Sequence, residues 1–399
     1  MKSNYKKLAP YIRLVDIRNT SDERYDLLGV SVDKHFIKSI ANTIGTDWRT
    51  YKVIQKGQFC YIPDTSRRGD KMGIALLTDY DIALVSQAYT VFEIINQEQL
   101  LPEYLNLWFK RPEFDRYARF HSHGSVREIF DWEEMCNVEL PIPEIEEQRK
   151  IVEAYKTIEK RIALKRKIND NLESQARAIF HRYFIQDNDE KQYKAGTFND
   201  LVLETVGGDW GDAETTDSTK RTRVRCIRGA DIPAMNLGCF ADAPIRYILH
   251  KNFEQKHLIS NDIIIEISGG SPTQSTGRIA YISDEVLNRS AEPFICSNFC
   301  RVLRIKGDYF CYVVQYWQYL YRNGRMFTYE NSSTGLKNFD LNGFLTEEEI
   351  PIPPIEIVAR FQKEVMPIYR EIRSNGIQIE HLERTMPNIL PMMLANLSR

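Results

Sequence analysis

The sequence PIPEIEEQRKIV at residues 141–152 returns in altered form as PIPPIEIVARFQ at residues 351–362, an offset of 210 residues. Each copy leads into a long segment with a heptad-like apolar stripe. Further landmarks keep the same order upstream of both copies, namely Trp108 and Trp317, and the Phe-Asp pairs at 130–131 and 339–340. Because this frame matches while the segments between its landmarks differ, the pattern indicates two versions of one unit, each with its own recognition head.

The stripe after the first copy advances in alternating steps of four and three residues, as the seam of a coiled coil does. Its apolar members are Ile151, Tyr155, Ile158, Ile162, Leu172 and Ile179. The second stripe repeats these steps in register with Phe361, Val365, Ile368, Ile372, Ile379 and Leu382. Polar residues enter the seam at Lys165, Asn169 and Asn375, and a polar residue in a seam typically fixes the register of the helices. We therefore expect two long helices packed as an antiparallel coiled coil.

The second stripe contains residues that disturb a helix. Pro367, Gly376, Pro387 and Pro391 predict kinks or an early end of the second helix. Two unrelated amphipathic helices, each packed on its own head, are the alternative to a paired coil. That arrangement does not require the two stripes to match in step, so the matching favours pairing.

The expected architecture is α+β, with two globular heads, each a twisted β-sheet with helices, separated by the two long helices in a pseudo-twofold repeat. The four parts are residues 1–141, 142–186, 187–351 and 352–399. Short β-rich runs bounded by turn residues predict strands at 51–54, 58–62, 73–77, 89–95, 224–227, 262–267, 279–282 and 299–305. Residues 101–120 predict one helix around Trp108, and residues 310–321 predict its counterpart around Trp317.

Composition narrows the possible classes of protein. A chain of 399 residues is long enough for more than one domain, and its sequence has no apolar run that could span a membrane. The first residues, MKSNYKKLAP, lack the apolar stretch of a secretory signal, so we expect a cytoplasmic protein. Seven cysteines without CxxC pairs predict reduced, buried thiols. The net charge of −2 counts against nucleic-acid binding, although basic residues cluster at 67–71, 165–167 and 220–228.

The motifs of DNA-modifying enzymes are absent from the sequence. It contains neither the glycine-rich turn that binds a methyl-donor cofactor nor a Pro-Pro-aromatic segment that holds a base amine. Residues 270–278 match a phosphate-binding loop only in spacing, because Arg278 stands where a lysine is needed. Asp262 and Glu266 are spaced like a nuclease metal site, but Ser268 occupies the lysine position. We predict no catalytic residue and no metal site.

Long segments of the first half resemble one protein family. They are LLGVSVDKHFIKSIANTIGTD (27–47), YKVIQKGQFCYIPDTSRRGDKMGIAL (51–76) and residues 101–152, which contain LPEYLNLWFKRPEFDRYARF and PIPEIEEQRKIV. This chain resembles the specificity (S) subunits of type I restriction-modification systems, with the second head matching only in its order of elements and closing turn. The resemblance implies that each head is a target recognition domain and that the helices bind modification subunits. It also implies that the methylation chemistry, with S-adenosylmethionine and ATP, belongs to partner subunits.

Polar loops at matching points of the two heads supply the candidate DNA-binding residues. They are Ser66, Arg67, Arg68, Lys71, His123, Ser125 and Arg127 in the first head, and Thr273, Gln274, Ser275, Arg278, Ser333 and Lys337 in the second. Arginine can bind guanine edges, amide side chains can bind adenine, and small hydroxyls can hold phosphates. Ordinary solvated hairpin loops are the alternative for each of these segments.

The function expected from these features is a non-enzymatic subunit that reads a bipartite, asymmetric site in double-stranded DNA. Such a subunit would recruit two methyltransferase subunits and, in the full complex, restriction subunits. The alternative is a coiled-coil scaffold whose heads bind other proteins.

Overall fold

The computed structural model describes residues 5–40, 45–65, 71–124, 128–186, 193–214, 219–240, 242–269, 271, 273–333 and 336–396. Tertiary contacts divide the chain into two compact units. Unit 1 comprises Met1–Arg161 with Glu383–Arg399, and unit 2 comprises Ile162–Leu382. Each unit therefore contains one head and a stretch of each of the two long helices.

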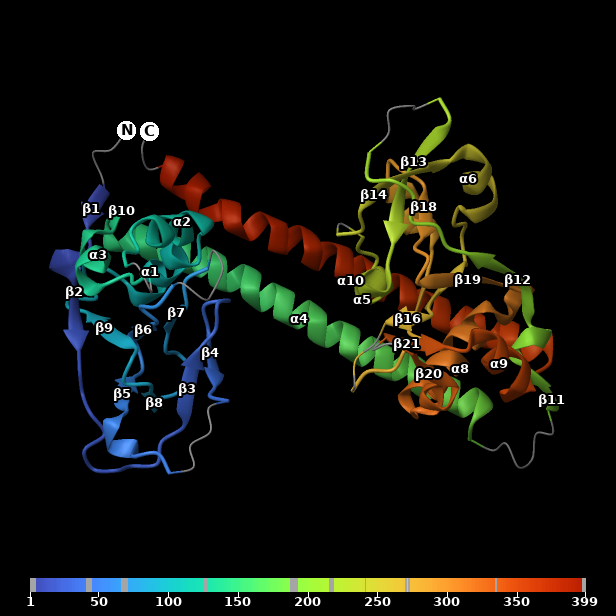
Figure 1. The fold of residues 1–399 in the computed structure, drawn as a ribbon, viewed down its shortest axis with the longest axis horizontal. Coiled ribbons are helices and arrows are strands. Elements are labelled where there is room, and N and C mark those ends of the chain that lie inside the picture. Colours follow the sequence, from blue (N-terminus) through green and yellow to red (C-terminus); the bar gives the residue numbers. More distant parts are fainter. Residues whose placement is uncertain are drawn as a thin grey trace. The chain divides into compact units, whose positions relative to one another are not determined.

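The described residues of unit 1 form short strands and short helices (Figure 1). The strands are β1 (Tyr5–Lys7), β2 (Ile12–Val15), β3 (Leu27–Val30), β4 (Phe36–Lys38), β5 (Lys52–Gln55), β6 (Phe59–Tyr61), β7 (Ile74–Leu76), β8 (Ile82–Val85), β9 (Thr90–Ile94) and β10 (Glu139–Pro141). The helices are α1 (Pro102–Phe109), α2 (Pro112–Phe120) and α3 (Trp132–Asn137). The strand orders are β2-β9-β6-β7 and β4-β3-β8-β5, and β1 pairs with β10. The main core packs aromatic side chains such as Phe59, Phe92 and Phe109 beneath the helices.

Unit 2 repeats this plan with extra elements. Its strands are β11 (Lys194–Thr197), β12 (Val202–Gly207), β13 (Arg221–Ile227), β14 (Ile245–Leu249), β15 (Ile263–Glu266), β16 (Ser268–Gly269), β17 (Ile279–Tyr281), β18 (Phe294–Cys296), β19 (Cys300–Ile305), β20 (Glu330–Ser333), β21 (Leu336–Phe339) and β22 (Glu349–Ile352). Its short helices are α5 (Ile232–Asn236), α6 (His250–Lys256), α7 (Asp284–Arg289), α8 (Phe310–Arg322) and α9 (Leu341–Glu347). The strand orders are β12-β19-β15-β17, β14-β13-β18 and β16-β21-β20, and β11 pairs with β22.

The repeat predicted from the sequence is confirmed in the internal fold of the two units. The sheet β2-β9-β6-β7 of unit 1 has the same order and strand directions as β12-β19-β15-β17 of unit 2. A short antiparallel pair closes each head at the Pro-Ile-Pro turn. In unit 1 the Tyr104 hydroxyl donates to the Pro141 carbonyl at 2.8 Å, and in unit 2 Tyr312 donates to the Pro351 carbonyl. In each head the helix that carries the landmark tryptophan, α1 in unit 1 and α8 in unit 2, therefore holds its own closing turn.

The long helices are α4 (Ile145–Phe184) and α10 (Ile355–Asn396), and they pair antiparallel within each unit. In unit 1 the Tyr155 hydroxyl donates to the Met386 carbonyl at 2.8 Å. In unit 2 a polar layer lies in the seam: Lys165 Nζ donates to Asn375 Oδ1 at 2.9 Å, and Asn375 Nδ2 donates to Asn169 Oδ1 at 3.0 Å. The Asn169 amide in turn donates to the backbone carbonyl of α10. The three polar seam residues thus satisfy one another.

Burial varies along the seam. The buried members are Ile151, Tyr155, Ile162, Phe361, Val365, Ile372 and Ile379. The half-buried members are Ile158, Leu172, Ile179, Ile368 and Leu382. Ile151 and Tyr155 belong to the core of unit 1, and the seam residues that belong to the core of unit 2 or pack against it are Leu172, Ile179, Phe361, Val365, Ile368 and Ile372.

Two helix predictions were wrong. The single helix expected over residues 101–120 is two helices, α1 and α2, because Pro112 holds Arg111 in an extended conformation with ψ of 141°. Of the kinks or early end expected for the second long helix, the early end does not occur, since α10 continues past its prolines to Asn396. Each proline removes only one amide donor, and neighbouring core residues such as Val365 and Leu390 hold the helix in place. Gly376 instead allows α10 to lie close to the backbone at Leu237, because a Cβ at this position would lie 2.2 Å from the Leu237 carbonyl oxygen.

Candidate nucleic-acid interface

In unit 1 the two predicted polar loops meet at one junction. The Phe130 amide donates to the Pro63 carbonyl at 2.9 Å, and the Thr65 amide and hydroxyl both donate to the Glu128 carbonyl, at 2.9 and 3.1 Å. These bonds bring the start of the loop that follows β6 against the segment that follows α2. The candidates Ser66, Arg67, Arg68, Ser125 and Arg127 lie outside the described residues, so their roles stay predictions. The residues that border these gaps, 63–65 and 128–130, hold the two loops together.

Unit 2 forms the same junction with different side chains. The Phe339 amide donates to the Ile267 carbonyl at 2.8 Å, and Ser268 and Gly269 continue the pairing opposite Asn338 and Lys337. The two Phe-Asp landmarks, which follow the second loop in each unit, therefore anchor equivalent contacts. In both units the aspartate then caps a short helix, because Asp131 accepts from the Glu134 amide and Asp340 from the Gly343 amide.

Helix α8 supports the loop over residues 268–278. The Trp317 indole nitrogen donates to the Gly277 carbonyl at 2.8 Å, and the Tyr321 hydroxyl donates to the Ser275 carbonyl at 3.0 Å. Within this loop Thr273 is exposed, Gln274 is half-buried and Ser275 is buried. The loop is therefore held by its backbone, and Thr273 is its most accessible candidate. The side chain of Ser333, at the end of β20, lies outside the described part of the structure.

The positively charged candidate of unit 2's loop is held by a buried carboxylate. Arg278 donates from Nε and Nη2 to the two oxygens of Glu266, both at 2.7 Å, and Glu266 is 3% exposed. Arg278 also donates to the Gly229 carbonyl at 3.1 Å. Lys337 is likewise paired, 3.1 Å from Glu330, with its Nζ 5.0 Å from the centre of the Phe327 ring. In this state both cations brace the junction, and the half-buried Gln274 lies beside Arg278.

The charged candidates of unit 1 lie closer to solvent. Lys71 Nζ is 3.0 Å from Asp33, and this hydrogen bond lowers the pKa of the Asp33 carboxyl. Both side chains are more than half exposed, so the pair is easily exchanged for another partner. His121 and His123 flank Glu134, at 3.1 and 4.0 Å, and the His123 side chain is 71% exposed. Lys71 and His123 are therefore available to an approaching anion.

Two aromatic side chains beside the unit 2 loop were missed by the sequence analysis. Trp210 and Phe299 are 36% and 57% exposed and line a cavity of about 560 Å³ together with Ser268 and Gly269. The guanidinium of Arg246 lies 4.0 Å from the centre of the Trp210 ring. An aromatic residue in a turn gives no distinctive sequence signal, because only the fold reveals whether its ring is buried.

The two carboxylates with nuclease-like spacing have structural partners. Asp262 is 1% exposed, accepts a hydrogen bond from the Ile259 amide at 2.9 Å and lies 3.1 Å from Arg304. Burial raises the pKa of Asp262 despite these contacts. Glu266 holds Arg278. Within the described ranges no group of three or more His, Cys, Asp or Glu side chains could hold a metal ion.

The same part of the chain contains no helix with enough length and apolar character to cross a lipid bilayer.

Comparisons with known proteins agree with this fold. The type I restriction modification DNA specificity domain matches residues 7–174 and 229–384. The type I restriction enzyme MjaIX specificity subunit of Methanocaldococcus jannaschii is 25% identical over 315 residues, covering 75% of this chain and 70% of that protein. The HindI specificity subunit of Haemophilus influenzae is 28% identical over 163 residues, covering 40% of this chain and 35% of that protein.

A solved structure shares the fold over nearly the whole chain. The type I restriction-modification S subunit from M. genitalium superposes with a TM-score of 0.56 at 11% identity, covering 98% of this chain and 95% of that one. The matched domain lies in both halves of the sequence, as the internal repeat requires. The chain therefore belongs to the type I restriction-modification specificity subunit family, whose members recognise DNA sequences.

Proposed function

We propose that this chain reads a bipartite, asymmetric DNA site, with each head contacting one half-site through its loop junction. The observation that carries this proposal is the pair of equivalent junctions, formed by Phe130 with Pro63 in unit 1 and by Phe339 with Ile267 in unit 2. Their backbone contacts match, whereas the side chains around them differ. A shared frame with different loop chemistry is what two different targets require.

The loop chemistry favours different bases in the two half-sites. The first loop contains Arg67, Arg68 and Lys71, whose charged donors suit guanine edges and phosphates. The second loop offers Thr273 and Gln274, and an amide side chain can bond both polar atoms on the major-groove edge of adenine. We therefore expect the half-sites to differ, which makes the complete site asymmetric. His123, Ser125, Arg127, Ser275, Ser333 and Lys337 are proposed as further contacts to bases or phosphates.

We assign no catalysis to this chain, and propose that the chemistry belongs to two methyltransferase subunits and, in the full complex, restriction subunits. S-adenosylmethionine and ATP would bind to those partners. The stretch of α4 within unit 2 supports a protein partner, because Leu164 and Ile168 are 60% and 39% exposed on it. Apolar side chains on an exposed helix face are typical of a surface that a second protein covers.

The test is to express this chain with its cognate methyltransferase subunit in a host that lacks the corresponding methylation. Single-molecule sequencing then locates every modified adenine. Methylation confined to one split, asymmetric motif supports the proposal and gives both half-sites. A soluble complex that binds DNA without any motif, or that methylates nothing, overturns it in favour of a scaffold whose heads bind proteins.

A further inference from the structure

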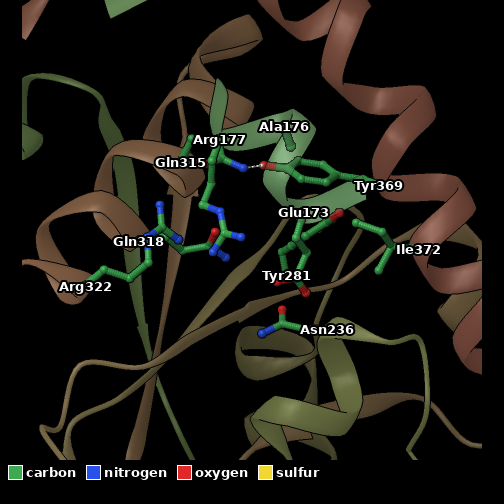
Figure 2. A pocket seen from close by; sticks show the side chains of 10 residues that line it. All are labelled: Glu173, Ala176, Arg177, Asn236, Tyr281, Gln315, Gln318, Arg322, Tyr369 and Ile372. Carbon is green, nitrogen blue, oxygen red and sulfur yellow. Dashed lines mark hydrogen bonds between the residues drawn. The ribbon is translucent and has the colours of Figure 1, made fainter. Parts of the chain in front are cut away.

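Two adjoining cavities in unit 2 form a groove beside the loop junction, and the second of them is also lined by Arg278. Their volumes are about 270 and 230 Å³, and both are lined by Asn236, Gln318 and Arg322. The first cavity continues to Arg177 on α4, and the second reaches Gly277 in the predicted recognition loop. Figure 2 shows Arg177, Gln318 and Arg322 on one side of the first cavity and Tyr369 and Ile372 of α10 on the other. We call this surface the arginine groove, after Arg177 and Arg322.

The two arginines of the groove lack the carboxylate partners that other arginines of unit 2 have. Within the described residues Arg322 forms no hydrogen bond or ion pair, and Arg177 donates only to the Ser174 hydroxyl, at 2.8 Å. Burial and the nearby positive charge of Arg177 lower the pKa of Arg322. By contrast, Arg278 and Arg304 are each paired with a buried carboxylate. Two neighbouring guanidinium groups that repel each other form a site to which an anion is attracted.

The inner wall of the groove also has unused hydrogen-bonding capacity. Gln315 is 2% exposed and donates from Nε2 to the Tyr369 hydroxyl at 2.6 Å, but its Oε1 has no partner. Within the described residues the Gln318 amide likewise forms no hydrogen bond with protein. A buried carbonyl oxygen without a partner is costly, so a ligand or water that donates to it is favoured. The groove therefore combines two arginines with amide groups that can donate to an anion, and the carboxylate of Glu173 also lines it, which leaves one net positive charge.

We propose that the arginine groove binds the sugar-phosphate backbone of DNA next to the second half-site, with Arg177 and Arg322 each contacting a phosphate. This inference rests on the proposed function and extends it to a second surface of the same head. The groove ends at Gly277, and helix α8, which carries Arg322, also holds that loop through Trp317. DNA whose bases meet the loop would therefore present its backbone to the groove. Arginine binds phosphate oxygens with two parallel donors, which suits this role.

The experiment uses the complex of this chain with its methyltransferase subunit, and fluorescently labelled duplexes that contain either the mapped site or a scrambled site. Dissociation constants are measured across a range of salt concentrations for wild type, Arg177→Gln, Arg322→Gln and the double variant. Arg360→Gln is the matched control, because Arg360 is an exposed arginine of α10 that does not line the groove. Arg322→Lys tests whether charge alone restores binding. Circular dichroism and gel filtration establish that each variant is folded and assembled.

Each single variant is expected to lower the slope of log affinity against log salt by about 0.9, and the double variant by about twice that, because each phosphate contact releases counterions. The loss at 0.1 M salt is roughly fivefold to tenfold per arginine and equal for both duplexes, since phosphate contacts carry no sequence information. Arg322→Lys restores most of the slope, and Arg360→Gln leaves the slope unchanged.

Three outcomes overturn the inference while leaving the proposed function intact. The first is an unchanged slope in folded variants of a complex whose wild type binds its site specifically. The second is weaker assembly with the methyltransferase subunit at an unchanged salt slope, which would make the groove a site for a partner's carboxylate. The third is a loss confined to the mapped site, which would make these arginines base contacts. A wild-type complex that prefers neither duplex overturns the proposed function itself.

Discussion

The two heads share a backbone junction but support it differently. In unit 1 Trp108 is 8% exposed, with the Arg111 guanidinium 4.4 Å from its ring centre. In unit 2 Trp317 is 1% exposed, and its indole donates to the Gly277 carbonyl of the predicted recognition loop. The landmark tryptophan thus packs a helix in one head and also fixes a loop in the other. The frame can stay constant while each loop acquires its own support, which is how two copies of one unit could come to recognise different sequences.

The buried ion pairs differ in the same way. Unit 1 places Lys34 2.8 Å from Asp115, with side chains 5% and 13% exposed, beneath its helices. Unit 2 places Arg278 against Glu266, with side chains 21% and 4% exposed, at the loop junction. The first pair stabilises the body of its head, and the second pair stabilises the proposed DNA-contacting surface. Breaking each pair therefore tests whether the stability of a head and its recognition of DNA are coupled in both heads or only in the second.

Trp317→Ala is expected to have the largest effect. Removing a buried tryptophan costs about 3 to 5 kcal/mol, and this change also leaves the Gly277 carbonyl without its donor. Because a chain of two units need not unfold in one step, the measurement is hydrogen exchange resolved by peptide. Protection should fall in unit 2, including the loop over 268–278, and persist in unit 1. Trp108→Ala is the matched variant, and its losses should be smaller and confined to unit 1.

Asp115→Asn and Glu266→Gln come next. Asp115→Asn leaves the nearly inaccessible Lys34 without its carboxylate, which should destabilise unit 1 by about 3 kcal/mol. Glu266→Gln should cost about 2 kcal/mol, because water can reach Arg278. Hydrogen exchange measured at increasing denaturant concentrations gives the loss of stability in each unit. Methylation mapping shows whether the recognised sequence changes. Glu266→Gln should relax the second half-site, whereas Asp115→Asn should weaken binding without changing the motif. Equal relaxation of both half-sites by either variant would contradict the comparison.

The polar layer of unit 2's helix pair should matter more for register than for stability. Replacing Lys165, Asn169 and Asn375 together with leucine should leave stability unchanged or raise it by about 1 to 2 kcal/mol, because the group is removed as a whole. Register should be less well defined, since a polar seam residue specifies it. The measurement is methylation of DNA libraries whose gap between half-sites varies by one base pair. The triple variant should accept more gap lengths than wild type.

The matched control for register lies in unit 1. Tyr155→Phe removes only the hydroxyl that donates to the Met386 carbonyl, at a cost of about 1 kcal/mol. It should keep a single gap length. If the triple leucine variant also keeps one gap length, the polar layer does not set the register.

The smallest effect is expected for an exposed contact between the same helices. Arg182 and Glu364 lie 2.9 Å apart with side chains 63% and 43% exposed. Glu364→Gln should change the free energy of unfolding by less than about 0.5 kcal/mol, because surface ion pairs contribute little. Thermal denaturation at two salt concentrations measures this change. A loss above 1 kcal/mol would indicate that this contact orders the helix pair.

Much of the fold could be predicted because periodicity records burial directly. The repeated Pro-Ile-Pro turn, the matched apolar stripes and the polar residues of the seam all correspond to structural features of the two units. The failures came from local chemistry that competes with packing. The apolar spacing alone predicts one continuous helix, but Pro112 divides it into two. By contrast, α10 stays helical through four residues that disfavour helices, because its packing stabilises it.

The candidate site could be predicted only as loops. The partner of Arg278 is Glu266, and no sequence pattern shows that the two side chains point at each other across the junction. Arg373 shows the same limit, because it is 2% exposed with its guanidinium 3.7 Å from the centre of the Tyr281 ring, and no sequence pattern indicates that contact. Whether an arginine or lysine is free to bind DNA depends on which side chains lie next to it in the folded structure, and the order of residues in the sequence does not show this.

The central claim is that the two heads recognise their half-sites independently, and one methylation map tests it most directly. Thr273→Ala and Gln274→Ala are combined in the second head, and modified adenines are mapped for the variant and for wild type with the same methyltransferase subunit. The account predicts that one half of the motif accepts more sequences while the other half is unchanged. Relaxation of both halves, or an unchanged motif, would contradict it.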